Sequence, residues 1–181
     1  MNTEPDIRQT GRELSRIVYT SEQIQERVSE MAAEITRAYE PEDELLVLGL
    51  LKGSFIFLAD LVRRIQLPIH VDFLVASSYG DRKTSGGHVN LLYDPEASVE
   101  GRSVILVEDI IDSGTTMKRL IPLLKGRGPR SLEVCALLHK RVAELDPEPR
   151  WVGFDAPLEF LVGYGLDYGE DFRHLPYIGS L

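Results

Sequence analysis

Three carboxylates lie within five residues of one another, directly after a short apolar run. The run is residues 103–107, and the acids are Glu108, Asp109 and Asp112. Four small residues, Ser113-Gly114-Thr115-Thr116, follow and lead into an amphipathic stretch. Small residues let backbone N–H groups approach a phosphate closely, and a helix N-terminus adds partial positive charge there. The small residues therefore suit a terminal monophosphate.

The carboxylates need a different partner, because they would repel that phosphate. They can hold a sugar through its hydroxyls, or Mg²⁺ through its bound waters. Residues 108–116 therefore predict a site for a phosphorylated, metal-chelated sugar. An alternative interpretation is an acidic helix start, in which Asp112 and Ser113 only serve as N-caps.

Other phosphate-binding classes fit the sequence less well. A strand that ends in an acidic pair also occurs in phospho-acceptor receiver domains, but there the pair follows the first strand. Here about a hundred residues precede Glu108, and the Ser-Gly-Thr-Thr continuation is wrong for a receiver. The chain contains neither GxxxxGK[ST] nor GxGxxG, so ordinary NTPase and dinucleotide-binding functions lose support.

The apolar periodicity predicts the elements that position these residues. We expect helices over residues 20–38, 55–65 and 115–125, and strands over 45–50, 69–77, 103–107 and 132–138. Thr20 and Gln23 have capping-box spacing, and Pro122 is expected to bend or shorten the third helix. We expect a long polar loop over residues 80–102, in which some of residues 89–92 could pair as an edge hairpin. This alternation implies an α/β fold with a mainly parallel sheet, whose ligand lies beyond the C-terminal strand ends.

Composition excludes several other classes. The 181 residues carry 20 basic and 29 acidic side chains, a net charge of −9, which argues against nucleic-acid or anionic-membrane partners. Cys135 is the single cysteine and is expected to be a buried inert thiol. The polar start does not resemble a signal peptide, and the longest apolar stretch, 45–51, is too short to span a membrane. A cytoplasmic protein is expected.

Residues 104–116 resemble the phosphoribosyl-pyrophosphate motif of type I phosphoribosyltransferases, in the hypoxanthine or hypoxanthine-guanine branch. Leu51-Lys52-Gly53 resembles that family's pyrophosphate loop, whose Leu-Lys peptide is typically cis. Ser78-Tyr79-Gly80 resembles the start of a flexible loop, 79–95, that closes over the active site. Residues 140–141 and 160–168 resemble the base-binding segments. The resemblance covers roughly residues 15–180.

The resemblance implies one phosphoribosyltransferase domain over 1–181, with a base-binding hood from about 1–20 and 150–181. Asp112 would be the catalytic acid/base, and Glu108, Asp109 and Asp167 would hold Mg²⁺. The purine would contact Ile110, Lys140, Phe160, Leu161 and Asp167. Phosphoribosyl pyrophosphate would contact Lys52, Gly53, Ser78, Tyr79, Glu108, Asp109, Asp112, Ser113, Gly114, Thr115, Thr116 and Arg173.

The implied reaction transfers 5-phosphoribosyl from phosphoribosyl pyrophosphate to N9 of hypoxanthine, and of guanine. Family members are usually homodimers or homotetramers. Leu161 stands where valine or isoleucine is common, which blurs the base preference. Two alternatives stay open: a transferase for another base such as xanthine, and an RNA-binding regulator on the same fold, against which the −9 charge weighs. The four histidines show no ligand spacing, and no role is assigned to them.

Overall fold

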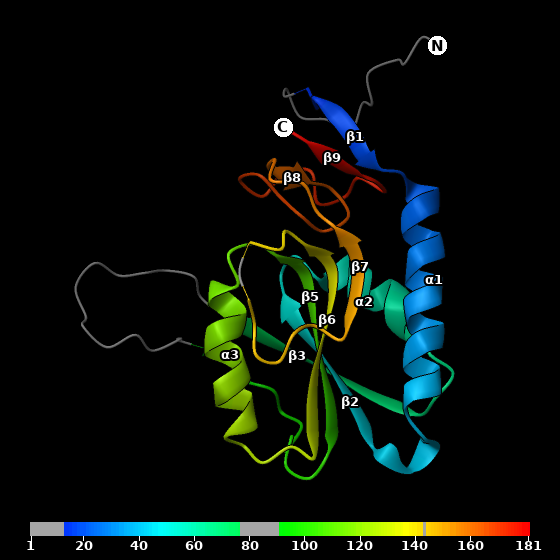
Figure 1. The fold of residues 1–181 in the computed structure, drawn as a ribbon, viewed down its shortest axis with the longest axis vertical. Helices are drawn as coiled ribbons and strands as arrows, with labels where there is room; N and C mark the ends of the chain where they lie inside the picture. The colour runs from blue at the N-terminus through cyan, green and yellow to red at the C-terminus, as the bar shows by residue number, and fades with distance from the viewer. Residues whose placement is uncertain (1–12, 77–90, 143) are drawn as a thin grey trace, which may run out of the picture.

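The computed structural model describes residues 13–76, 91–142 and 144–181, and these residues form two sheets and three α-helices (Figure 1). Ser78, Tyr79 and most of the predicted 79–95 loop lie outside the described residues. Among the residues that are described, no helix is long and apolar enough to cross a membrane.

The larger sheet has six strands in the order β4-β3-β2-β5-β6-β7. Neighbours are parallel except β4, which pairs antiparallel with β3 at one edge. The strands are β2 (Leu45–Leu51), β3 (Ile69–Ala76), β4 (Leu91–Tyr93), β5 (Ser103–Ile111), β6 (Ser131–His139) and β7 (Trp151–Asp155). This confirms the predicted α/β fold with a mainly parallel sheet.

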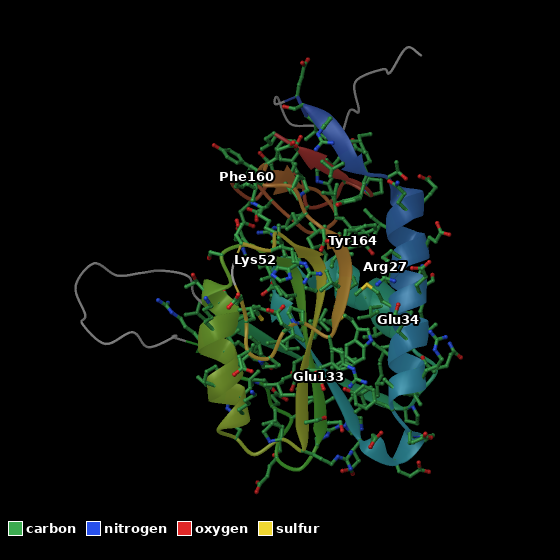
Figure 2. The ribbon with its side chains drawn as sticks, viewed as in Figure 1. Arg27, Glu34, Lys52, Glu133, Phe160 and Tyr164 are labelled. Carbon is green, nitrogen blue, oxygen red and sulfur yellow. The ribbon has the colours of Figure 1, made fainter. Side chains whose placement is uncertain are left out.

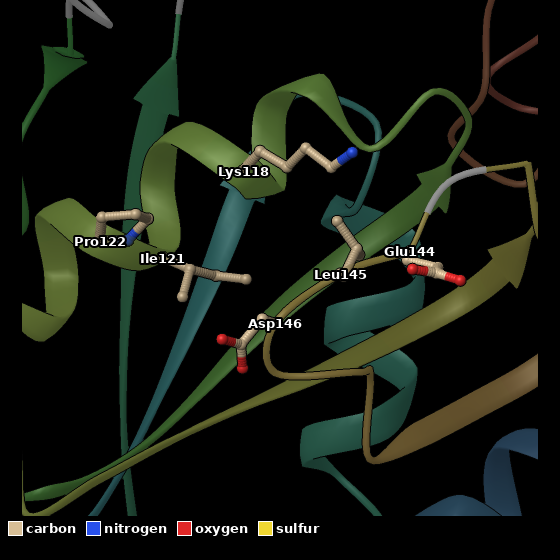
Figure 3. A pocket seen from close by; sticks show the side chains of 6 residues that line it. All are labelled: Lys118, Ile121, Pro122, Glu144, Leu145 and Asp146. Carbon is tan, nitrogen blue, oxygen red and sulfur yellow. The ribbon is translucent and has the colours of Figure 1, made fainter.

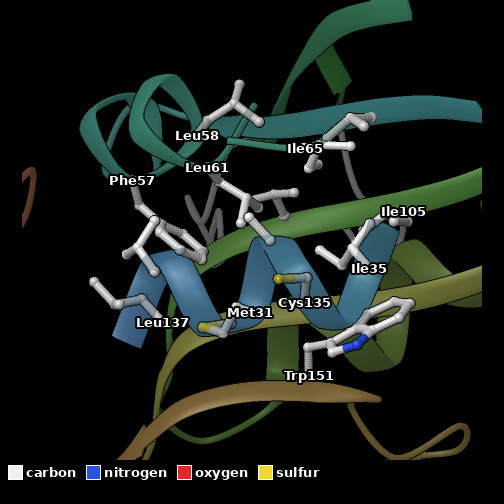
Figure 4. Packing of buried hydrophobic residues seen from close by; sticks show 14 of the residues in the cluster. Met31, Ile35, Phe57, Leu58, Leu61, Ile65, Ile105, Cys135, Leu137 and Trp151 are labelled. Carbon is white, nitrogen blue, oxygen red and sulfur yellow. The ribbon is translucent and has the colours of Figure 1, made fainter. Parts of the chain in front are cut away.

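Helices cover both faces of this sheet, so its central strands are apolar throughout. On one face lie α1 (Ser21–Ala38) and α2 (Phe55–Val62), and on the other lies α3 (Thr115–Lys125) (Figure 1). Figure 4 shows Met31 and Ile35 of α1 packed over Cys135 and Trp151. Cys135 is fully buried there, and burial raises the pKa of its thiol, as expected for an inert cysteine.

The start of α1 was predicted correctly, whereas the end of α2, a 3₁₀ turn and a shortening of α3 at Pro122 were not. Thr20 and Gln23 form the expected capping box, with Thr20 N–H donating to Gln23 Oε1 at 2.9 Å. The second helix ends at Val62, three residues earlier than predicted. A short 3₁₀ turn, η1 (Pro41–Asp43), separates α1 from β2, and α3 continues through Pro122 to Lys125.

A second sheet is built from the two ends of the chain. It has the order β1-β9-β8, all antiparallel, with β1 (Arg16–Tyr19), β9 (Ile178–Ser180) and β8 (Leu161–Val162). We call this sheet and its connecting segment 163–177 the hood. It lies beyond the end of the large sheet toward which β7 points (Figure 1). Trp151–Asp155, which the sequence analysis grouped with the hood, forms β7 of the large sheet instead.

The acidic segment also differs from the prediction. The strand does not end at Val107, because β5 runs on to Ile111 and pairs Glu108 with Ala136 and Ile110 with Leu138 of β6. Glu108 and Asp109 are therefore strand residues with buried side chains, and they do not lie in a solvated turn.

Candidate active site

Glu108 and Asp109 place two carboxylates side by side near the end of β5. Asp109 N–H donates to Glu108 Oε1 at 3.2 Å, and Ile110 N–H donates to Asp109 Oδ1 at 2.7 Å. Burial, together with the charge of Asp109, raises the pKa of Glu108 well above its usual range. A cation at this position would relieve the repulsion between the two acids.

The acid pair fits Mg²⁺ better than it fits a metal caged entirely by protein. Among residues 13–76, 91–142 and 144–181, no group of three or more His, Cys, Asp or Glu side chains is placed to hold a metal. Mg²⁺ is usually bound by one or two carboxylates, several waters and the phosphates of a substrate. Two adjacent carboxylates are therefore sufficient protein ligands for a Mg²⁺ ion that is also coordinated by substrate phosphates.

The small residues after β5 form a cradle at the start of α3. Gly114 is the N-cap residue, in the left-handed region at φ 72°, and makes no side-chain cap, while Ser113 Oγ accepts from the Thr115 N–H at 3.4 Å. Ser113 and Thr115 hold their hydroxyls 2.9 Å apart. A cavity of about 80 Å³ is lined by residues 110–117 together with Glu108. The N-cap interpretation of Asp112 is therefore wrong, and the cradle remains the better explanation of this sequence.

Asp112 stands at the rim of this cradle and contacts Lys140. The Lys140 Nζ atom lies 3.2 Å from Asp112 Oδ2, although the two residues are 28 positions apart. The Lys140 side chain is only 9% exposed, whereas that of Asp112 is 64% exposed. The backbone N–H of Lys140 also donates to the Ile111 carbonyl at 3.0 Å, which fixes the turn after β6. An exposed carboxylate beside a sheltered ammonium leaves room for a ligand.

The Lys52 loop lies against the same acids. Its Leu51–Lys52 peptide is cis, as the resemblance implied. A Cβ on Gly53 would overlap the Asp109 carboxylate, so only glycine allows the loop to approach β5 this closely. The Lys52 ammonium is paired with Glu170 of the hood at 3.1 Å.

The hood contributes an ion pair and an aromatic face. Arg173 Nη2 lies 2.8 Å from Asp167 Oδ1, and Arg173 Nη1 donates to the Gly165 carbonyl at 2.7 Å. Phe160 is 52% exposed and meets Tyr168 edge-to-face at 5.5 Å. Figure 2 places Phe160 and Lys52 toward the end of the molecule where the hood meets the large sheet. Leu161 is buried in β8, so any contact with a base would come from its backbone.

The structure thus brings together predicted residues that are distant in sequence. Direct contacts join Lys140 to Asp112 and Gly53 to Asp109, and within the hood a further contact joins Arg173 to Asp167. Two residues that were not predicted also make contacts near here: Glu170 pairs with Lys52, and the Tyr164 hydroxyl donates to Asp60. The alternation Gly163-Tyr164-Gly165, which flanks an aromatic residue with two unrestricted glycines, was a usable signal for the second.

A larger cavity of about 430 Å³ lies elsewhere, between α3 and the loop after β6 (Figure 3). It is lined by Lys118, Ile121, Pro122, Glu144, Leu145 and Asp146. None of these is a predicted site residue, so size alone does not locate the chemistry of this protein.

Comparison with known proteins agrees with this arrangement. The family model of the phosphoribosyl transferase domain matches residues 17–169. The hypoxanthine-guanine phosphoribosyltransferase of Dictyostelium discoideum is 43% identical over 169 residues, covering 91% of this chain and 94% of that protein. The hypoxanthine phosphoribosyltransferase of Salmonella typhimurium is 44% identical over 161 residues, covering 88% and 90%. A crystal structure of a hypoxanthine phosphoribosyltransferase from Staphylococcus aureus has a TM-score of 0.85 at 41% identity, covering 93% and 91%.

The mainly parallel sheet, the acids at the end of β5, the glycine at the start of α3 and the hood beyond the strand ends form the fold of type I phosphoribosyltransferases, to which the solved structure above belongs. The chain belongs to the phosphoribosyl transferase domain family. Within that family, the relatives and the solved structure named above all carry the hypoxanthine or hypoxanthine-guanine name.

Proposed function

We infer that this protein is a purine-salvage enzyme that transfers 5-phosphoribosyl from phosphoribosyl pyrophosphate to N9 of hypoxanthine and of guanine. The products are IMP or GMP and pyrophosphate. The observation that carries the inference is the 3.2 Å contact between Lys140 and Asp112 at the rim of the phosphate cradle. This contact joins Lys140, which is expected to recognise the base, to Asp112, which is expected to accept a proton from the base.

The donor is bound by groups at the strand ends. The cradle 113–116 offers backbone N–H groups and hydroxyls for the 5′-phosphate. Glu108 and Asp109 orient the ribose hydroxyls, and Lys52, Gly53 and Arg173 bind the pyrophosphate. Glu108, Asp109 and Asp167 would hold Mg²⁺, which would supply charge neutralisation for the pyrophosphate leaving group.

The base is bound between the hood and the large sheet. The Lys140 ammonium donates to O6 of the 6-oxopurine, and the exposed ring of Phe160 stacks on its face. Ile110, Leu161 and Asp167 complete the pocket. N9 attacks the ribose C1, the bond from C1 to the pyrophosphate oxygen breaks, and Asp112 accepts the N7 proton. The Asp112 carboxylate is exposed in the structure, and a bound base would cover it during the proton transfer.

A base panel tests the proposal. Purified protein is incubated with phosphoribosyl pyrophosphate, Mg²⁺ and either hypoxanthine, guanine or xanthine, and the nucleotide is followed by absorbance. We expect turnover with hypoxanthine and guanine that stops when EDTA removes the metal. Turnover with xanthine alone would favour the alternative substrate. Turnover with none of the bases, together with specific RNA binding at ~150 mM salt, would favour the regulator.

We also propose that the protein is a homodimer or homotetramer. Strand β3 lies next to the edge strand β4, and it exposes Val71 and Phe73, with Tyr93 of β4 and Phe55 of α2 also exposed. Apolar side chains left exposed near a sheet edge support a covering partner, and a second copy is the simplest. Sedimentation velocity at micromolar concentration tests this, and a single monomeric species would contradict it. Closure of 79–95 and a cytoplasmic location stay predictions.

A further inference from the structure

Tyr164 adopts a backbone conformation that tyrosine rarely takes. Its φ is +51°, and it stands between Gly163 at +98° and Gly165 at +102°. Such a conformation persists only where surrounding contacts fix it, and it frequently marks a functional constraint. Here the Tyr164 N–H donates to the Leu175 carbonyl and the Gly165 N–H to the Arg173 carbonyl, both at 2.9 Å.

The side chain of Tyr164 is fixed by a partly buried acid on α2, Asp60. The hydroxyl, on a side chain that is nearly fully buried, donates to Asp60 Oδ2 at 2.6 Å. Gln25 of α1 donates to the same oxygen at 3.0 Å, and Arg63 and Arg64 pair with Asp60 from the next turn. Asp60 therefore joins α1, α2 and the hood.

Both groups are held in the protonation states that this bond requires. Burial, reinforced by the adjacent carboxylate, raises the pKa of the Tyr164 hydroxyl, so it stays a donor. Burial alone would raise the pKa of Asp60, but hydrogen bonds from Tyr164 and Gln25 outweigh it and lower that pKa. A phenol donating to a carboxylate is a charge-assisted hydrogen bond, which is stronger than a neutral one.

The backbone next to Tyr164 connects this anchor to the donor site. Gly165 lies so close to the carbonyl of Gly53 that a Cβ would overlap the oxygen, and its own carbonyl accepts from Arg173. Gly53 in turn lies against the Asp109 carboxylate. A shift of Tyr164 would therefore displace both groups assigned to the pyrophosphate, the Lys52–Gly53 loop and Arg173.

We propose that the Tyr164–Asp60 hydrogen bond holds the hood against the Lys52–Gly53 loop and makes Tyr164 a positioning residue for phosphoribosyl pyrophosphate. The inference rests on the proposed function for its substrate. Tyr164 does not touch the reacting atoms, so its loss acts through the loop and Arg173. Removal of the Tyr164 hydroxyl should weaken the binding of phosphoribosyl pyrophosphate more than it lowers the turnover of the bound complex.

The test is Tyr164→Phe, which keeps the ring and removes the hydroxyl. We expect the KM for phosphoribosyl pyrophosphate to rise about tenfold, with a smaller change in kcat. The rise should stay below the roughly 10²-fold loss that a misplacement of about 1 Å can cause. The increase in Tm that phosphoribosyl pyrophosphate and Mg²⁺ produce should be roughly 3–5 °C smaller than in the wild type. Asp60→Asn retains an acceptor and should give an intermediate KM.

Tyr39→Phe is the matched control, because Tyr39 is also buried in the core around α1 but lies at the other end of that helix. Its KM should match the wild type. An unchanged KM in Tyr164→Phe overturns the inference, and so does a lower Tm with an unchanged ligand-induced increase. Absence of turnover in the wild type would instead refute the proposed function. The ligand-induced Tm increase would then still decide whether Tyr164 positions the donor site.

Discussion

The contact between Gly165 and the Gly53 carbonyl predicts a large effect from adding one methyl group. Gly165→Ala places a Cβ onto a backbone oxygen that cannot rotate away. The hood and the loop then have to separate by roughly 1 Å to restore an ordinary C···O contact. A displacement of that size next to reacting groups can cost about 10²-fold in rate. We therefore expect kcat/KM for phosphoribosyl pyrophosphate to fall about 100-fold.

Stability should change as well, and a control separates the two causes. A non-glycine residue in left-handed backbone costs roughly 1–2 kcal/mol, and overpacking adds roughly 1–3 kcal/mol. Gly169→Ala carries only the first cost, because Gly169 has φ +61° and nothing within 4 Å of its added Cβ. Urea unfolding should show a loss of about 1–2 kcal/mol for Gly169→Ala and about 2–5 kcal/mol for Gly165→Ala.

Steady-state kinetics of the two variants at several donor concentrations completes the test. Gly169→Ala should keep kcat/KM within about twofold of the wild type. If Gly165→Ala were equally active, the close approach of the hood to the pyrophosphate loop would have no functional importance, and the reasoning would be refuted.

Three further predictions concern single side chains. Asp112→Asn should lower kcat by about 10²–10⁴-fold and leave the KM for phosphoribosyl pyrophosphate within about threefold, and an unchanged kcat would remove its role as the base. Arg27→Lys should lower the free energy of unfolding by about 1–3 kcal/mol. The reason is that lysine cannot make both of the hydrogen bonds that Arg27 donates to the β7 carbonyls. Equal urea midpoints for the two proteins would contradict this. Burial and the charge of Arg141 lower the pKa of His139 in the folded protein. Above the usual pKa of about 6.5 the imidazole is neutral in both the folded and the unfolded protein, so it does not reduce the free energy of unfolding. As the pH falls below that value the unfolded protein binds the proton first, and the folded protein loses stability. His139→Leu should flatten the fall of Tm between pH 7 and 5, and parallel curves for the two proteins would count against this.

The sequence predicted the parts of the fold whose signals are local. The wholly apolar run of β2 and the capping box of α1 specify a buried strand and a helix start without any tertiary information. Similarly, the small residues over 113–116 indicated a helix start after the acids, which the structure places at Gly114 and which we propose as the phosphate site. These features depend on neighbours in sequence, so their physics can be evaluated before the chain is folded.

The hood could not be predicted in the same way. Its strands have two to four residues, too few for a periodic pattern, and β1 pairs with β9 across almost the whole chain, as Arg16 with Ser180 shows. The extension of β5 through Glu108 and Asp109 was missed because acids disfavour buried strands. The strand continues because residues 108–111 pair with β6, and this long-range pairing cannot be seen in the local sequence. The Tyr164–Asp60 bond spans 104 residues and has no local signature.

Each of three cations at the site has a carboxylate from the same chain as its neighbour: Lys52 has Glu170, Lys140 has Asp112, and Arg173 has Asp167. The acids act as built-in counter-ions. The polyanionic donor would exchange with these tethered carboxylates at Lys52 and Arg173, and the base would do so at Lys140. At a bare basic surface a polyanion would instead displace dissolved ions. Salt competes with a ligand in proportion to the dissolved ions that binding releases. We therefore expect the affinity for a phosphorylated substrate to depend weakly on ionic strength. That property would let an acidic protein bind a polyanion at physiological salt without a basic surface.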